Sequence, residues 1–155
     1  MKKLSIILAN NILIILLVVI SLTLCIKNYT PNTFLTGWDT IHPEFNFRIY
    51  WARILASVWQ EHQGLGDVSV QAHASEIPRI LLLTFFSLFL KMNQLRYAYT
   101  FLMLVLGSVG VYLFLKRVIF AKYTVLSANV GAFLGGLLYL LNLGTLQHFY
   151  VPLEI

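Results

Sequence analysis

The amino-acid sequence predicts an all-α polytopic membrane protein, with about three transmembrane helices and further interfacial or juxtamembrane helices in a long first external loop. Composition is the first reason, because 59% of the 155 residues are hydrophobic and only 11% are charged. Soluble domains average about 45–50% apolar and about 25% charged residues. The second reason is that the apolar residues gather in runs of about 20, the length that crosses a bilayer.

Three apolar segments are long enough to span a membrane. The first covers residues 1–26 and begins with Lys2 and Lys3. We expect it to be an uncleaved anchor, since it lacks the short apolar region and small-residue cleavage site of a signal peptide. The others cover residues 97–115 and 124–143, separated by a short basic loop at 116–123 that is predicted to be cytoplasmic.

The polar part of the chain is a loop over residues 27–96, which holds five of the six acidic residues. Its aromatic content is too high for a disordered segment. Apolar residues recur at helical spacing over 46–60, which predicts an amphipathic helix at the membrane interface. The apolar run at 77–90 has only half the length of a span and predicts a half-helix. Residues 144–155 are expected to begin a further, truncated external segment.

Two topologies fit these segments. In the preferred one, 77–90 does not cross, and the basic residues at the ends of the spans are all cytoplasmic: Lys2, Lys3, Lys116, Arg117 and Lys122. In the other, residues 77–95 span and the basic loop lies outside. Short loops follow the distribution of Lys and Arg, which favours the first. Both place residues 27–79 outside.

The densest polar cluster runs from Gly37 to Glu44. Asp39 and Glu44, with His42 between them, could act as a general base, as ligands of a cation or as hydrogen-bond acceptors for a substrate. A polar turn would explain the same residues. No metal-ligand spacing is present, so no metal centre is predicted.

Arginines are the candidate phosphate ligands of the loop. Arg48, Arg53 and Arg79 could hold a phosphate, because guanidinium groups match its oxygens, or could extend toward lipid headgroups instead. The basic residues beside the apolar runs are topology signals, and no nucleic-acid partner is predicted. In the last span Ser127, Gly131, Gly135 and Gly136 predict close helix packing, and Gly107 and Gly110 are similar.

Several stretches together resemble the amino-terminal region of GT-C type membrane glycosyltransferases, most closely the arabinofuranosyltransferase-like bacterial membrane proteins. The resemblance covers nearly the whole chain as a pattern of organisation. The stretches that carry it are Gly37-Trp38-Asp39, His42-Pro43-Glu44, Val58-Trp59-Gln60-Glu61, Gln63-Gly64-Leu65-Gly66, Ile77-Pro78-Arg79, Asn93 to Arg96-Tyr97, Lys116-Arg117, Tyr139-Leu140-Leu141-Asn142 and Pro152-Leu153-Glu154.

The resemblance implies a multi-pass protein of the bacterial inner (plasma) membrane, with a cytoplasmic amino terminus and catalysis at the external face. The donor would be a polyprenyl-phosphate-linked sugar, and the acceptor a cell-envelope glycan. Asp39 would be the catalytic base, with Glu44 the second candidate. His42, Arg48, Arg53 and Arg79 are the candidate substrate-binding residues. The resemblance leaves the cofactor open.

Two departures from the family pattern are visible. Many of these enzymes carry an adjacent Asp-Glu pair in the loop, whereas Asp39 is followed by Thr40. The family also has many more spans, so we expect this chain to be a fragment that is inactive by itself. The alternative is a non-catalytic membrane protein, such as a transporter or flippase portion or an assembly subunit. Ionisable residues inside the spans, typical of ion-coupled transporters, are absent from the long runs.

Overall fold

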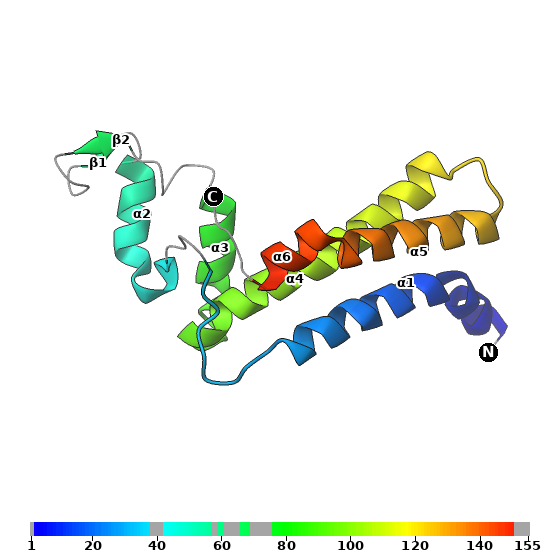
Figure 1. The fold of residues 1–155 in the computed structure, drawn as a ribbon, viewed down its shortest axis with the longest axis horizontal. Helices are drawn as coiled ribbons and strands as arrows, with labels where there is room; N and C mark the ends of the chain where they lie inside the picture. Colours follow the sequence, from blue (N-terminus) through cyan, green and yellow to red (C-terminus); the bar gives the residue numbers. More distant parts are fainter. Residues whose placement is uncertain (1, 38–41, 57–58, 61–65, 69–75, 151–155) are drawn as a thin grey trace. The chain divides into compact units, whose positions relative to one another are not determined.

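The computed structural model describes residues 2–37, 42–56, 59–60, 66–68 and 76–150, and these form helices, one short ladder and the segments that connect them (Figure 1). The prediction of an all-α chain is confirmed at this level. In chain order the elements are α1 (Lys2–Lys27), η1 (Pro43–Phe45), α2 (Phe47–Ala56), β1 (Trp59–Gln60), β2 (Asp67–Val68), α3 (Ile77–Phe86), α4 (Met92–Phe114), η3 (Leu115–Ile119), α5 (Val125–Leu141) and α6 (Leu143–Tyr150).

The chain divides into two compact units. Unit 1 comprises Met1–Pro31 and Thr100–Val151, and unit 2 comprises Asn32–Tyr99 and Pro152–Ile155. Helix α4 contributes its first two turns to unit 2 and the remainder to unit 1.

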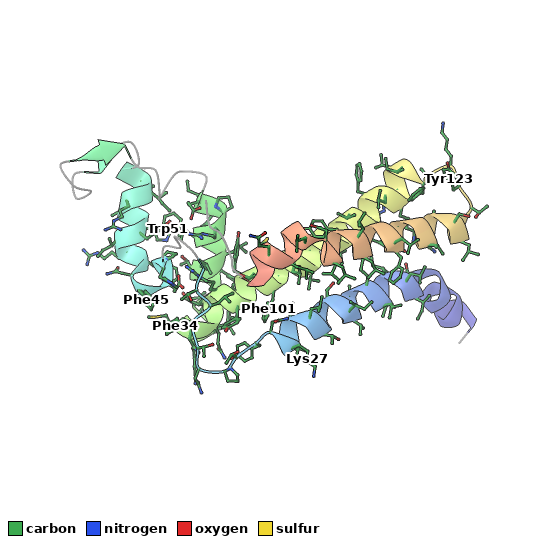
Figure 2. All side chains as sticks on the ribbon, viewed as in Figure 1. Lys27, Phe34, Phe45, Trp51, Phe101 and Tyr123 are labelled. Carbon is green, nitrogen blue, oxygen red and sulfur yellow. The ribbon has the colours of Figure 1, made fainter. Side chains whose placement is uncertain are left out.

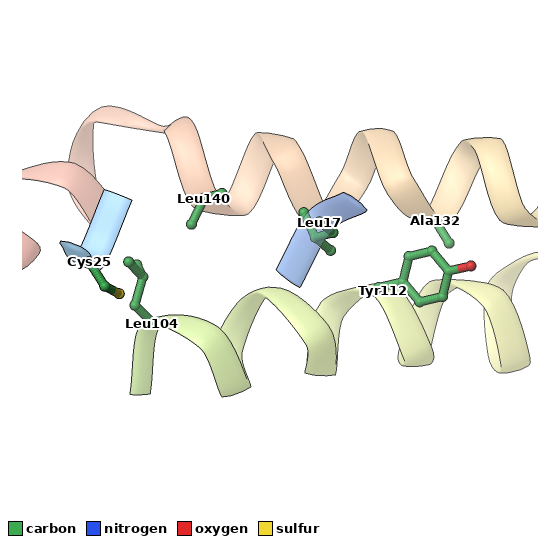
Figure 3. Close-up of a cluster of buried hydrophobic side chains, with 6 residues drawn as sticks. All are labelled: Leu17, Cys25, Leu104, Tyr112, Ala132 and Leu140. Carbon is green, nitrogen blue, oxygen red and sulfur yellow. The ribbon is translucent and has the colours of Figure 1, made fainter. Parts of the chain in front are cut away.

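Unit 1 is a bundle of α1, α4 and α5 around a continuous apolar core. Figure 3 shows the six buried side chains at its centre, which are Leu17, Cys25, Leu104, Tyr112, Ala132 and Leu140. Two polar contacts lie within this core. The hydroxyls of Ser21 and Ser108 are 3.1 Å apart, and the Tyr112 hydroxyl donates to Oδ1 of Asn129 over 3.2 Å. Buried polar groups thus bond to one another across the helices, as an apolar surrounding requires.

Glycines allow these helices to approach closely, as the small-residue pattern predicts. A Cβ atom at Gly136 would lie 2.6 Å from Cδ2 of Leu17, closer than atoms in contact can come. Phe120 lies against Gly131 in the same way, and Leu115 against Gly135. Gly110 differs from the prediction, because a Cβ there would meet nothing within 4 Å among the described residues.

One helix of the described residues, Met92–Ile119, is long and apolar enough to cross a membrane by length and composition. Asn11–Lys27, Ile77–Phe86 and Val125–Leu141 are shorter apolar helices, and the first of them is part of the 26-residue α1. The predicted segments 97–115 and 124–143 correspond to the later part of α4 with η3, and to α5. The presence of three spans stays a prediction.

In unit 2, α2 lies where the amphipathic helix at 46–60 is predicted, but it is shorter. Asn46 caps it, since its Oδ1 accepts a hydrogen bond from the backbone N–H of Ile49 at 3.1 Å. The predicted end at Gln60 is wrong, because Trp59 and Gln60 form β1 and pair with β2 in antiparallel register.

The apolar stripe of α2 packs within unit 2. Tyr50 and Ile54 are buried together with Ile80, Leu83 and Leu95, which come from α3 and from the first turn of α4. The indole N–H of Trp51, which is labelled in Figure 2, donates to Oγ1 of Thr84 at 3.4 Å. The buried side of α2 therefore packs against α3 and the start of α4.

Helix α3 is even shorter than the predicted half-helix at 77–90. Pro78 lies in its first turn, and the helix ends at Phe86. Ten residues rise about 15 Å, whereas the hydrocarbon core is about 30 Å thick. Since α4 starts anew at Met92, residues 77–95 do not form one continuous helix, as the rival topology would require. Where a truncated external segment is predicted from 144, the structure has α6, capped by Asn142.

Candidate functional site

The candidate site is built around η1, a single helical turn that directs Glu44 inward. Pro43 begins the turn, and its carbonyl accepts a hydrogen bond from the N–H of Asn46, the residue that also caps α2. With about three residues per turn, neighbouring side chains point about 120° apart. Glu44 is 3% exposed, whereas Phe45 is 53% exposed.

The carboxylate of Glu44 is held by two basic side chains. Nδ1 of His42 lies 2.9 Å from Oε1, and Nε of Arg96 lies 3.4 Å from the same oxygen. The Arg96 side chain is 3% exposed and comes from the second turn of α4. Within the described part of the chain, Oε2 of Glu44 has no hydrogen-bond partner. One carboxylate oxygen is thus positioned by two basic side chains, and the other is buried without a hydrogen-bond partner among the described residues.

Aromatic rings lie beside His42. The rings of His42 and Phe45 are 5.1 Å apart, and those of Phe34 and Phe45 are 5.3 Å apart (Figure 2). Phe34 and Phe45 are both exposed, so their outer faces are accessible. Thr33 and Tyr97 exchange a hydrogen bond of 2.9 Å between their hydroxyls, which ties the segment carrying Phe34 to α4.

A second ion pair lies between α2 and α3. Arg79 pairs with Glu76 one turn earlier, and the Tyr50 hydroxyl donates to Oε2 of Glu76 over 3.2 Å. Burial, together with the negative charge of Glu76, raises the pKa of Tyr50 to about 12. Tyr50 therefore stays neutral and acts as a donor across the physiological range.

The Glu44 carboxylate can take part in proton transfer. A carboxylate with one oxygen fixed and the other without a partner among the described residues can accept a hydrogen bond or a proton from a hydroxyl group. Among the described residues no group of three His, Cys, Asp or Glu side chains could hold a metal ion.

The predicted site residues lie in different places in the structure. Asp39 lies outside the described residues. Glu44 and His42 are brought together, as their spacing suggests. Arg48 is exposed on α2 and Arg53 is partly exposed, so neither lies in the buried cluster.

Two further arginines form ion pairs with acidic side chains of unit 2. Arg79, a predicted substrate ligand, is buried in its pair with Glu76. Arg96 is not among the predicted site residues, although it contacts Glu44. A signal did exist, because an arginine at the start of a long apolar helix follows a loop that is rich in acids.

Comparisons with protein-family models, curated proteins and solved structures found no match for this chain.

Proposed function

We propose that unit 1 is embedded in a lipid bilayer. Large apolar side chains are exposed along all three helices, among them Leu16, Leu106, Leu134 and Leu138. Leaving such surface in water is unfavourable by about 25 cal/mol per Å². Unit 1 also contains no Asp or Glu in its sequence. Lipid is the surrounding that suits a bundle that is apolar outside as well as inside.

The orientation that we propose has the basic end of the bundle in the cytoplasm. The amino end of α1 and the connection between η3 and α5 lie at the same end of unit 1 (Figure 1). That end carries five of the six cations of the unit, namely Lys2, Lys3, Lys116, Arg117 and Lys122. Excess Lys and Arg in short loops favours the cytoplasmic side. Unit 2 would then lie outside.

For function, we propose that the chain belongs to a GT-C type glycosyltransferase that acts at the external face of a bacterial inner membrane. The donor is a polyprenyl-phosphate-linked sugar and the acceptor a cell-envelope glycan. The observation that supports the proposal is the buried carboxylate of Glu44, whose Oε2 has no hydrogen-bond partner among the described residues, in the unit that holds all six acidic residues.

The reaction assigns a role to each group. The base, Glu44 or Asp39, takes the proton of an acceptor hydroxyl while that oxygen attacks the anomeric carbon of the donor sugar. The bond from that carbon to the phosphate oxygen breaks, and polyprenyl phosphate leaves with the electron pair. The configuration at the sugar carbon is inverted. Arg96 and His42 hold Glu44 in place.

The test measures transfer of a radiolabelled sugar from a polyprenyl-phosphate donor in membranes that contain the full native protein. We compare Asp39→Asn and Glu44→Gln with the control Glu76→Gln, which alters another carboxylate of unit 2 that is paired with arginine. Loss of the base is expected to reduce transfer by about 10²- to 10⁴-fold at equal protein amounts. Full transfer by both Asp39→Asn and Glu44→Gln would remove the two carboxylates from the mechanism.

A second candidate function is a non-catalytic membrane subunit. The observation that favours it is that Glu44 and Glu76 each pair with an arginine, which also stabilises a purely structural unit. Here Glu44→Gln and Glu76→Gln would lower the melting temperature of unit 2 alike, and neither would change sugar transfer. The same two variants therefore separate the two functions.

A further inference from the structure

Charge is divided unevenly between the two units. Unit 1 carries six Lys and Arg and no acid, a formal charge of +6. Unit 2 carries five Lys and Arg and six acids, a formal charge of −1, which together make the +5 of the whole chain. A unit of one sign alone lacks internal ion pairs, so its cations are available to anions from outside.

Three of these cations form a surface at the turn between η3 and α5, which we call the basic surface: Lys116, Arg117 and Lys122. Arg117 and Lys122 are exposed. Lys116 extends over the ring of Tyr112, with Nζ 5.6 Å from the ring centre. The turn itself is closed by a hydrogen bond from the N–H of Tyr123 to the carbonyl of Phe120 at 3.0 Å.

Apolar side chains flank the basic surface. Val118 is 60% exposed, Ile119 is 52% exposed and Tyr123 is 64% exposed. The rings of Phe120 and Tyr123 meet edge to face at 5.8 Å. Cations interleaved with exposed aliphatic and aromatic groups suit the boundary of a bilayer, where phosphates lie directly above acyl chains. A nucleic acid offers phosphates but no acyl chains to cover these apolar groups.

We infer that the basic surface binds the anionic headgroups of phospholipids in the cytoplasmic leaflet, beyond its part in orienting the chain. This inference rests on the membrane placement of unit 1 proposed above, but not on sugar transfer. Lys116, Arg117 and Lys122 contact lipid phosphates, while Val118, Ile119 and Tyr123 contact the upper acyl chains. Each such cation favours an anionic lipid by up to about fivefold (about 1 kcal/mol).

The experiment measures which lipids surround the intact protein. The chain is placed in phosphatidylcholine vesicles, and spin-labelled phosphatidylglycerol or phosphatidylcholine reports the fraction of lipid immobilised at its surface. We compare the wild type with Lys116→Gln/Arg117→Gln/Lys122→Gln. The control is Lys27→Gln/Lys91→Gln, which removes two exposed cations outside the basic surface.

We expect wild type and control to prefer phosphatidylglycerol several-fold at low salt. The preference should fall toward one in the basic-surface variant, and in the wild type at 1 M salt, where the Debye length is about 3 Å. An unchanged preference in the basic-surface variant, or an equal loss in the control, overturns the inference. Absence of any immobilised lipid would overturn the membrane placement as well. Loss of sugar transfer in the Glu44 and Asp39 variants bears only on the catalytic proposal.

Discussion

The contact between Arg96 and Glu44 makes the sharpest prediction about unit 2. Replacing Arg96 by Met leaves the Glu44 side chain, which is 1% exposed, with His42 as its remaining ion-pair partner among the described residues. At 3.4 Å and an effective dielectric constant of 20, the attraction between the two charges is about 5 kcal/mol. Most of this offsets desolvation, but removal of one partner from a buried pair still costs about 3–5 kcal/mol.

Tryptophan fluorescence is a suitable assay for this loss. All three tryptophans belong to unit 2, so their emission follows the unfolding of that unit alone. A loss of 3 kcal/mol should lower the melting temperature of a unit of this size by at least about 10 °C. The control is Arg48→Met, which removes an exposed arginine and should change stability by less than about 0.5 kcal/mol.

A double-mutant cycle decides whether the pair itself is responsible. If Arg96 and Glu44 act through each other, Glu44→Gln/Arg96→Met should lose at least about 1 kcal/mol less than the sum of the single variants. Additive losses would show that Arg96 stabilises unit 2 through other contacts. A melting temperature of Arg96→Met equal to that of Arg48→Met would refute the argument from burial.

Three further predictions concern other parts of the chain. The free energy of unfolding of unit 2 should fall by on the order of 2 kcal/mol between pH 10 and 12. The reason is that tyrosine in the unfolded chain has a pKa near 10, whereas Tyr50 in the folded unit has a pKa of about 12. Thermal unfolding of Tyr50→Phe over the same pH range should lack this fall. Gly136→Val should separate α5 from Leu17 and destabilise unit 1 by about 1–3 kcal/mol, as measured by thermal unfolding, whereas Gly110→Ala should be neutral or stabilising. Asn46→Ala should cost about 1 kcal/mol and speed amide exchange in the first turn of α2; unchanged exchange would mean that the cap contributes nothing.

The helices were predictable from the sequence because their signals are local. The apolar runs before Lys27 and Lys116 correspond to α1 and α4, and the stripe from Phe47 onward corresponds to α2. Helix ends were less predictable. Trp59 continues the helical spacing of α2, yet it pairs with Val68 in β1 and β2. A pairing partner nine residues away competes with helix propensity, and no local pattern reveals the outcome.

One of the two contacts of Glu44 in the candidate site was predictable from the sequence. Glu44 and His42 are close in sequence, so their contact follows from spacing alone. Arg96 lies 52 residues beyond Glu44, and its approach depends on how α4 packs against η1. Arg79 shows the reverse case, since a residue type suited to phosphate is paired with Glu76 within its own helical turn.

The sequence by itself determined a helical chain poor in charge, with five of its six acids in one polar loop and cations at the ends of apolar runs, because composition and periodicity are properties of single segments. Only the tertiary structure decided which oxygen of Glu44 is held, which arginine holds it and which glycines lie against a neighbouring helix. Those features depend on distances between segments far apart in the chain, and such distances are set by packing rather than by local pattern.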